Sequence, residues 1–323
     1  MDKIAFCGSI LTDVIKMIPV WPERGMLVPI ESVSRAVGGS VCNSGIDLKT
    51  LDPSLTVKAV GRVGADDNGD FAVKFLESRG LDCSLVRRVE GVATSFTDVM
   101  TVRATGERTF FNLHGADSTL TPDDIDVDEL GVDILHFGYL LLLDGMDAPD
   151  AEYGTQAARL LAKAQAAGIK TSIDIVSEQS ERFARVVRPA LKHCDYVVIN
   201  EIEGSMATGV AANDLKGICE KLLELGVRER AVVHKPELGA SMGRGGDYTE
   251  VKSLKLPTGW IRGSVGAGDA FCAGMLYSFM RGLSPEEGLT LGAGAAACNL
   301  AVADSVSGAK SLAETLEIVK RFK

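Results

Sequence analysis

The chain has 323 residues, of which 46% are hydrophobic and 24% charged. Such a chain can bury a sizeable core, as one large α/β domain with an appendage or as two medium domains. Lys and Arg number 34 against 44 Asp and Glu, a net charge of −10, which argues against nucleic acid or an anionic membrane as the main partner.

The location of the protein is predicted from its N-terminus and its cysteines. Residues 1–6 lead into a strand-like run without the basic and apolar regions of a signal peptide. The apolar stretch 134–143 is too short to cross a bilayer. The seven cysteines are widely spread with no C-x-x-C, which indicates buried thiols and neither a disulfide framework nor a zinc site. We therefore predict a cytoplasmic protein without a membrane partner.

Short apolar runs alternate with helical patterns along most of the chain. Strands are predicted at 4–7, 57–60, 134–137, 170–173, 196–199 and 231–234, and helices at 41–51, 71–79, 153–167, 183–192 and 214–225. Two further helices rich in Ala and Gly are predicted at 268–281 and 285–303. Apolar strands that alternate with amphipathic helices predict an α/β fold, a mostly parallel sheet flanked by helices.

Two segments do not fit this alternation. Residues 10–37 contain three prolines and no convincing helix, and residues 94–112 alternate around Ala104-Thr105-Gly106, a hairpin pattern. Together they predict one small β-sheet projecting from a single domain that spans 1–323. We interpret this sheet as a lid over a substrate cleft; an edge extension or a dimer sheet is the structural alternative.

The most informative short pattern is Gly266-Ala267-Gly268-Asp269, which precedes a predicted helix. Small residues at a helix start leave backbone amides free to bind an anion. A carboxylate beside such amides can accept a proton from a hydroxyl while the amides stabilise a transferring phosphoryl group. Asp269 could equally be an ordinary helix N-cap, and the four residues alone do not decide between these roles.

Three other patterns supply polar groups that suit a ligand. Gly38 and Gly39 allow close backbone approach, and Asn43 follows in the next helical turn. Asn200 and Glu203 come directly after a predicted strand, where open α/β sheets bind ligands and where both side chains could hold metal-bound water. Asp13 follows the first strand and could bind vicinal hydroxyls. A glycine turn, a helix-capping pair and a turn aspartate are the structural alternatives.

Taken in order, these patterns resemble those of the ribokinase-like (PfkB) family of carbohydrate and nucleoside kinases, over essentially the whole chain. The resemblance rests on Gly8-Ser9 with Asp13, on Gly38–Asn43, on the stretch from Gly61 to Gly69 that is similar to "GxVGxDxxG", on Asn200-x-x-Glu203, and on Gly266–Asp269. It implies a ribokinase-like, Rossmann-like fold with a β lid, and ATP-dependent phosphorylation of a small acceptor.

The resemblance also implies a role for each matching residue. Asp269 is expected to be the general base, and the amides of Gly266, Ala267 and Gly268 the anion hole. Asn200 and Glu203 are expected to organise Mg²⁺ through water. The acceptor is expected to contact Asp13, Gly38, Gly39 and Asn43. Family members often dimerise through the lid, which implies a homodimer.

The chain departs from the family pattern at two places near the nucleotide. Gly263-Ser264 stands where the family usually has Asp-Thr, an Asp that helps to hold a monovalent cation. Pro236-Glu237-Leu238-Gly239 replaces the usual Gly-x-x-Gly, and proline stiffens that turn. Lys235, Gly239 and Asn299 complete the predicted nucleotide-binding set, and activation by a monovalent cation is not predicted.

Several polar residues lie in or near the predicted hairpin. Asn112 and His114 end the second β segment, where either could contact the acceptor, although a lone histidine is more often a structural hydrogen-bonder. Arg103 and Arg108 would attract a phosphorylated acceptor if they pointed inward, and exposed hairpin charges are the simpler interpretation. His136, inside an apolar strand, is predicted to be a buried core histidine.

Three functional alternatives remain at this stage. The first is phosphorylation of a sugar or sugar acid, and the second is a nucleoside kinase of the same fold, for which Phe110 and Phe111 offer aromatic rings. The third is a non-catalytic sugar- or nucleotide-binding relative. A dinucleotide-dependent oxidoreductase is disfavoured because the turn at Gly8-Ser9 lacks G-x-G-x-x-G.

Overall fold

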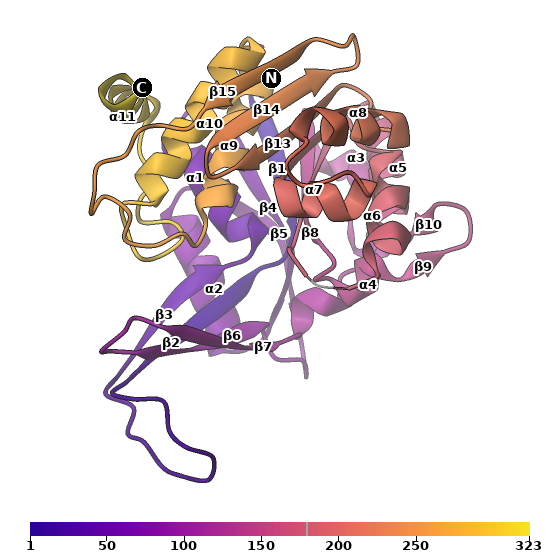
Figure 1. Cartoon of the computed structure of the whole chain (residues 1–323). Coiled ribbons are helices and arrows are strands. Elements are labelled where there is room, and N and C mark those ends of the chain that lie inside the picture. The colour runs from indigo at the N-terminus through magenta and orange to yellow at the C-terminus, as the bar shows by residue number, and fades with distance from the viewer. Residues whose placement is uncertain (179) are drawn as a thin grey trace.

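A nine-stranded sheet forms the centre of the computed structural model, which describes residues 1–178 and 180–323. Its strand order is β15-β14-β13-β12-β11-β8-β1-β4-β5 (Figure 1). From β13 to β5 neighbouring strands are parallel, whereas β14 and β15 are antiparallel additions at one edge. The strands are β1 (Lys3–Gly8), β4 (Thr56–Gly64), β5 (Asp82–Val89), β8 (Ile134–Leu140), β11 (Lys170–Ile175), β12 (Tyr196–Asn200), β13 (Arg230–Lys235), β14 (Leu238–Gly243) and β15 (Tyr248–Lys252).

Helices cover both faces of this sheet (Figure 1). One face packs against α1 (Ser40–Leu51), α2 (Asp67–Ser78), α9 (Ala267–Arg281) and α10 (Pro285–Asn299), with α11 (Leu312–Phe322) outside α10. The other face packs against α3 (Val127–Leu130), α5 (Gln156–Ala166), α6 (Phe183–Leu191), α7 (Glu201–Thr208) and α8 (Leu215–Leu225). Because both faces are covered, the central strands are apolar along most of their length and carry little alternation.

A second, four-stranded sheet projects from the main body (Figure 1). Its order is β3-β2-β6-β7, with β2 (Leu11–Ile18), β3 (Ser32–Gly38), β6 (Phe96–Val102) and β7 (Arg108–Leu113). The two central strands, β2 and β6, run parallel, and the two outer pairs are antiparallel. The prediction that segments 10–37 and 94–112 build one small sheet is therefore confirmed.

The predicted α/β class and the six predicted strands are confirmed. Predicted boundaries were wrong at three helices. Helix α2 begins at Asp67, four residues before the predicted start, with Asp66 as its cap. Helix α5 begins at Gln156, because a short hairpin of β9 (Pro149–Asp150) and β10 (Gly154–Thr155) precedes it, and Thr155 caps it. Helix α10 ends at Asn299, and the following residues form a loop. No predicted element corresponds to β5, β9, β10, β14, β15, α3, α4 (Asp144–Asp147), α7 or α11.

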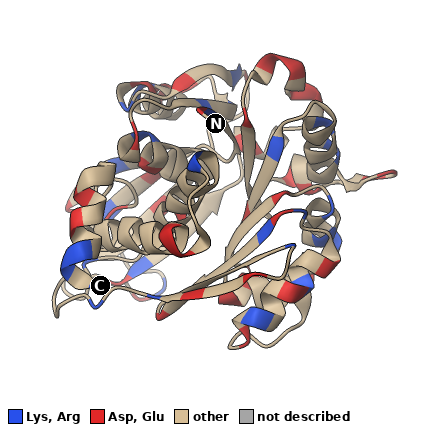
Figure 2. Cartoon of the chain, turned by 90° about the horizontal axis from the view of Figure 1, so that it is seen from above, with Lys and Arg blue, Asp and Glu red and all other residues tan. Residues whose placement is uncertain are grey.

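The cysteines, the apolar helices and the charged residues each bear on an expectation drawn from the composition. All seven cysteines are buried and free, as predicted. Among the described residues no helix is both long and apolar enough to cross a membrane. Basic and acidic residues alternate over the helices and loops in Figure 2, and Lys and Arg do not gather on one element.

Candidate active site

Asp269 lies in the first turn of α9, with Gly266 as the N-cap. The interpretation of Asp269 as the N-cap is therefore wrong. Gly266 adopts a left-handed conformation with φ of 79°, and a Cβ atom there would lie 2.6 Å from the Ser305 carbonyl oxygen. Only glycine meets both conditions, so this turn fixes where the helix starts and where the carboxylate of Asp269 points.

Three donors surround the Asp269 carboxylate, which is 9% exposed. The Asn43 amide donates to Oδ2 at 3.0 Å, and Ser44 Oγ donates to Oδ1 at 3.3 Å. The phenol of Tyr139, on β8, also donates to Oδ1, at 2.5 Å. Burial raises the pKa of Asp269 to about 6, and these hydrogen bonds act in the opposite direction. Above that pH the group is an ionised, desolvated carboxylate.

The amides of the first turn of α9 have no partner inside the helix and can bind an anion. Of the three amides predicted to form the anion hole, that of Ala267 already donates to a neighbouring group, the Ser264 carbonyl oxygen, at 3.3 Å. Gly268 faces His234, since a Cβ at Gly268 would lie 3.6 Å from the imidazole. The open side of this turn thus points toward the end of β13.

The turn from β3 into α1 places Asn43 against Asp269. Gly39, the N-cap of α1, has φ of 90°, and a Cβ atom there would lie 2.4 Å from the Ser9 carbonyl oxygen. A Cβ at Gly38 would meet Leu11 Cδ1 at 2.7 Å and Asp13 Oδ2 at 3.1 Å. The glycine pair is therefore required by close packing against the segment that follows β1.

Asp13 and Asn112 lie on the same face of the small sheet, joined through Thr97. Asp13 pairs with Thr97, and Thr97 with Asn112, in the strand register. Asn112 Nδ2 donates to Thr97 Oγ1 at 3.0 Å. Burial raises the pKa of Asp13 to about 6, while a hydrogen bond from Thr97 and the charge of Arg108 lower it. This face therefore combines a carboxylate, a hydroxyl and an amide.

Arg108 points from the small sheet toward the C-terminal part of the chain. Its guanidinium donates to the Ala303 carbonyl oxygen at 3.2 Å. Arg103 instead pairs with Glu31, at 3.3 Å, on the surface. The side chains of the two hairpin arginines thus point in different directions, and it is the charge of Arg108 that lowers the pKa of Asp13.

Asn200 and Glu203 form a capping box at the start of α7. Asn200 Oδ1 accepts from the amides of Ile202 and Glu203, and Glu203 Oε2 accepts from the Asn200 amide at 3.0 Å. Ser177 donates to Glu203 Oε1 at 2.6 Å. Burial raises the pKa of Glu203 to about 7. Asn200 and Glu203 therefore do form the helix-capping pair given above as their structural alternative. The Glu203 carboxylate nevertheless lines the same pocket as Asp269.

That pocket has a volume of about 270 Å³ and opens at the carboxyl ends of the parallel strands. It brings together four predicted residues, Gly268, Asp269, Asn200 and Glu203. Its walls also include residues that the sequence analysis missed: Tyr139, Asp174, Ser177 and His234. Tyr139, Asp174 and His234 lie near the ends of β8, β11 and β13, so the strand-end rule that selected Asn200 would also have selected them.

Asp13, Gly38, Gly39, Asn43 and Asn112 do not line this pocket, and neither do four other predicted ligand residues, which have partners elsewhere. His114 is bonded to Asp144 through Nδ1 at 3.1 Å. Lys235 ends β13 with Glu237 3.8 Å away, and Gly239 packs against Phe271 and Leu289 inside β14. Asn299, 1% exposed, donates to the Ser305 carbonyl oxygen at 2.7 Å and so fixes the C-terminal loop.

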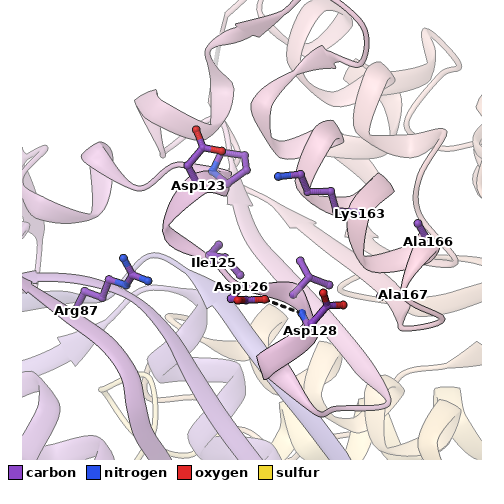
Figure 3. Close-up of a pocket in the computed structure, with 10 residues that line it drawn as sticks. Arg87, Asp123, Ile125, Asp126, Asp128, Lys163, Ala166 and Ala167 are labelled. Atoms are coloured by element: carbon purple, nitrogen blue, oxygen red, sulfur yellow. Dashed lines mark hydrogen bonds between the residues drawn. The ribbon is translucent and has the colours of Figure 1, made fainter.

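A larger pocket, of about 720 Å³, lies between Arg87, the segment 122–128 and the end of α5 around Lys163 (Figure 3). Its polar lining mixes basic and acidic side chains, and the Asp126 carboxylate accepts from the Asp128 amide. None of the predicted site residues lines this pocket. Volume alone therefore does not identify the candidate active site.

The fold and the pocket define an α/β protein of the ribokinase-like fold, with a polar site at the strand ends and a small second sheet that projects from the main body. The pfkB family carbohydrate kinase pattern matches residues 1–311. The chain therefore belongs to the pfkB family.

Individual proteins are similar to this chain in sequence or in fold. An uncharacterized sugar kinase of Archaeoglobus fulgidus is 27% identical over 229 residues, which cover 71% of this chain and 84% of that protein. Ribokinase from Thermotoga maritima has a similar structure, with a TM-score of 0.82 at 19% identity over 99% of this chain and 100% of that chain. Arabidopsis thaliana ribokinase, solved with ribose and ATP, has a TM-score of 0.80 at 19% identity over 99% of both chains.

Proposed function

We propose that this protein transfers the γ-phosphoryl group of ATP to a hydroxyl of a small sugar or sugar acid. The observation that carries the proposal is the Asp269 carboxylate, buried in the first turn of α9 and sharing a pocket with Asn200 and Glu203. Membership of the pfkB family and the ribose and ATP of the Arabidopsis ribokinase structure support it.

In the proposed reaction Asp269 accepts the proton of the attacking hydroxyl. A carboxylate whose pKa is about 6 is ionised at neutral pH and still basic enough to act there. The first-turn amides of α9, including that of Gly268, stabilise negative charge on the transferring group. Phosphoryl transfer depends mainly on positioning and charge stabilisation, so no covalent intermediate on the protein is needed.

The acceptor is proposed to lie between the small sheet and Asp269. Asp13, Asn112 and the turn at Gly38 and Gly39 offer it donors and acceptors, and Asn43 links this set to Asp269. We propose that segments 10–37 and 94–112 act as the lid of a single kinase domain spanning 1–323. The inward direction of Arg108 favours an acceptor with an acidic group, which is why sugar acids are included.

The family implies a role for Mg²⁺, and the pocket fits it. Both carboxylate oxygens of Glu203 already accept hydrogen bonds from Ser177 and the Asn200 amide, which leaves lone pairs for metal-bound water rather than a bare ion. When bound, the ion neutralises charge on the nucleotide phosphates. A carboxylate at 263 is missing, and a Cβ there would lie 2.9 Å from the Val302 carbonyl oxygen, so no monovalent cation is proposed.

Replacement of Glu203 by glutamine is expected to raise the Mg²⁺ concentration needed for half-maximal activity by about 10–100-fold. Glutamine also forms capping boxes, so α7 should remain intact while the carboxylate charge is lost. Glu287→Gln is the matched control, because Glu287 caps α10 in the same way with Ser284. Equal Mg²⁺ dependence in both variants would exclude the proposed role of Glu203.

The function itself is tested by measuring ADP release with Mg·ATP across neutral sugars, sugar acids and nucleosides. We expect turnover with a sugar or sugar acid. Preference for a nucleoside would instead indicate the nucleoside kinase, for which Phe110, 57% exposed on the small sheet, offers a ring. Absence of ATP binding and of turnover with every acceptor would contradict the proposal and favour a non-catalytic binding protein.

Tyr139→Phe is expected to move the acid limb of kcat/KM to higher pH by about one unit. The base works in its ionised form, so activity falls as the pH drops through the pKa of Asp269, about 6. Loss of the phenol removes a hydrogen bond that lowers this pKa. Tyr153→Phe, on the remote β9–β10 hairpin, should leave the profile unchanged. A Tyr139→Phe profile identical to that of the wild type would contradict the assignment of the limb to Asp269.

We also propose a homodimer formed through the outer face of the small sheet. Val33, Phe111 and Leu113 are exposed by 59, 52 and 41%, and Trp21 stacks on Phe111. Large contiguous apolar patches on a protein surface often mark interaction sites. Sedimentation should show a dimer for the wild type and a monomer for Phe111→Asp. A wild-type monomer at micromolar concentration would contradict the dimer.

The seven free thiols support a reducing, cytoplasmic location.

A further inference from the structure

Three side chains with metal-binding chemistry converge behind the candidate active site. They are His136 on β8, Asp174 on β11 and Cys272 on α9, and their ligating atoms all lie within 4.8 Å of one another. His136 pairs with Ser172 across the two strands, so Asp174 lies on the same face of the sheet, where α9 packs. All three residues are buried.

The two ring nitrogens of His136 differ in their hydrogen bonding, as they do in histidines that bind metals. Nδ1 lies 3.1 Å from Ser172 Oγ. Nε2 has no hydrogen-bond partner among the described residues, although the side chain is 0% exposed. With the proton on Nδ1, Nε2 presents a lone pair; metal-ligating histidines usually have their other ring nitrogen hydrogen-bonded in this way. A buried nitrogen without a partner otherwise costs free energy.

The other two ligands are also available. Asp174 Oδ1 accepts from the Ile175 amide at 2.7 Å, which orients the carboxylate and leaves Oδ2 for another partner. Cys272 is 1% exposed and carries a free thiol. Burial raises the pKa of both groups well above their usual values.

We propose that His136, Asp174 and Cys272 form a binding site for a divalent transition-metal ion of the Zn²⁺ type. A tetrahedral ion with ligands at 2.0–2.3 Å separates them by about 3.3–3.8 Å, so small side-chain rotations close the site. Asp174 binds as a carboxylate and Cys272 as a thiolate, whose thiol proton is released to solvent. With neutral imidazole the resulting unit has no net charge, which suits a desolvated position.

The donor set distinguishes this site from the proposed Mg²⁺ position. Thiolate and imidazole select Zn²⁺ and similar ions, whereas Mg²⁺ prefers oxygen ligands. Asp174 also lines the pocket that contains Asp269 and Glu203, so the proposed site borders that pocket. The site was invisible in the sequence because its residues belong to three separate elements and follow no metal-binding spacing.

The test uses Co²⁺ as the probe and reduced, chelator-treated full-length protein. We expect one Co²⁺ per chain, with a thiolate-to-cobalt charge-transfer band and the d–d bands of a four-coordinate ion, and displacement by Zn²⁺. Cys272→Ser, which keeps the side-chain size, should abolish the charge-transfer band. His136→Asn should weaken binding by more than about tenfold. Cys219→Ala, a change at another buried cysteine on α8, should leave the spectrum unaltered.

Circular dichroism of each variant establishes that it is folded before its spectrum is compared. A folded wild type without a thiolate–cobalt band would overturn the proposal, as would a band that persists in folded Cys272→Ser. These readouts do not depend on catalysis, so they are independent of the proposed kinase activity.

Discussion

Asp269→Asn is expected to lower kcat by about 1,000-fold while ATP affinity changes little. An amide cannot accept the proton of the acceptor hydroxyl, whereas its oxygen can still accept from Tyr139 and Ser44. Steady-state kinetics with the best acceptor, together with ATP binding by calorimetry, separate the two effects.

Asp128→Asn is the control for this substitution, since Asp128 is exposed at α3 and lines only the remote pocket. It should retain wild-type turnover. If Asp269→Asn turned over acceptor at the wild-type rate, the carboxylate would not be the base. If it lost ATP binding instead, Asp269 would serve the nucleotide site rather than proton transfer.

Gly39→Ala is expected to lower the free energy of unfolding by about 4 kcal/mol. Alanine at φ of 90° is strained, and its Cβ would lie 2.4 Å from the Ser9 carbonyl oxygen, so the backbone after β1 must move. Urea unfolding followed by circular dichroism measures the loss. Movement of the backbone at Gly39 would also displace Asn43, which follows in α1, and weaken its hydrogen bond to Asp269.

Gly91→Ala separates the two causes of that loss. Gly91 also has positive φ, 73°, but nothing lies within 4 Å of a Cβ atom there. Backbone strain alone should cost about 1 kcal/mol at this position. Equal destabilisation by both substitutions would show that the contact with Ser9 contributes nothing.

The parts of the fold that could be predicted are those with strong local patterns. The buried parallel strands are short apolar runs, and the main helices are amphipathic. Strand β5, an edge strand, carries charged residues, and β14 contains two glycines, so neither has the apolar pattern of a central strand. The order of strands in the small sheet depends on contacts between distant segments, which no local pattern records.

The residues of the candidate site that could be predicted are likewise those in local sequence motifs. Asp269, Asn43 and Glu203 lie in short motifs that fix local backbone geometry, and the structure places Asp269 in contact with Asn43 and in one pocket with Glu203. Tyr139 reaches Asp269 only because β8 lies beside β1 and beneath α9, a tertiary relation. Asn299, the last residue of α10, bonds the Ser305 carbonyl oxygen, and Lys235, the last residue of β13, lies beside Glu237; neither side chain lines the pocket, and no local pattern records these partners.

The parallel pairing of β2 with β6 has a consequence for folding on the ribosome. The hairpin of β2 and β3 leaves the ribosome early, but its other edge stays unpaired until β4, α2 and β5 have been synthesised and β6 follows. An unpaired strand edge can join the wrong partner. The charged pair of Lys16 and Asp98, 2.6 Å apart in the finished sheet, leaves a lone lysine on the waiting strand, and edge lysines oppose such misassembly.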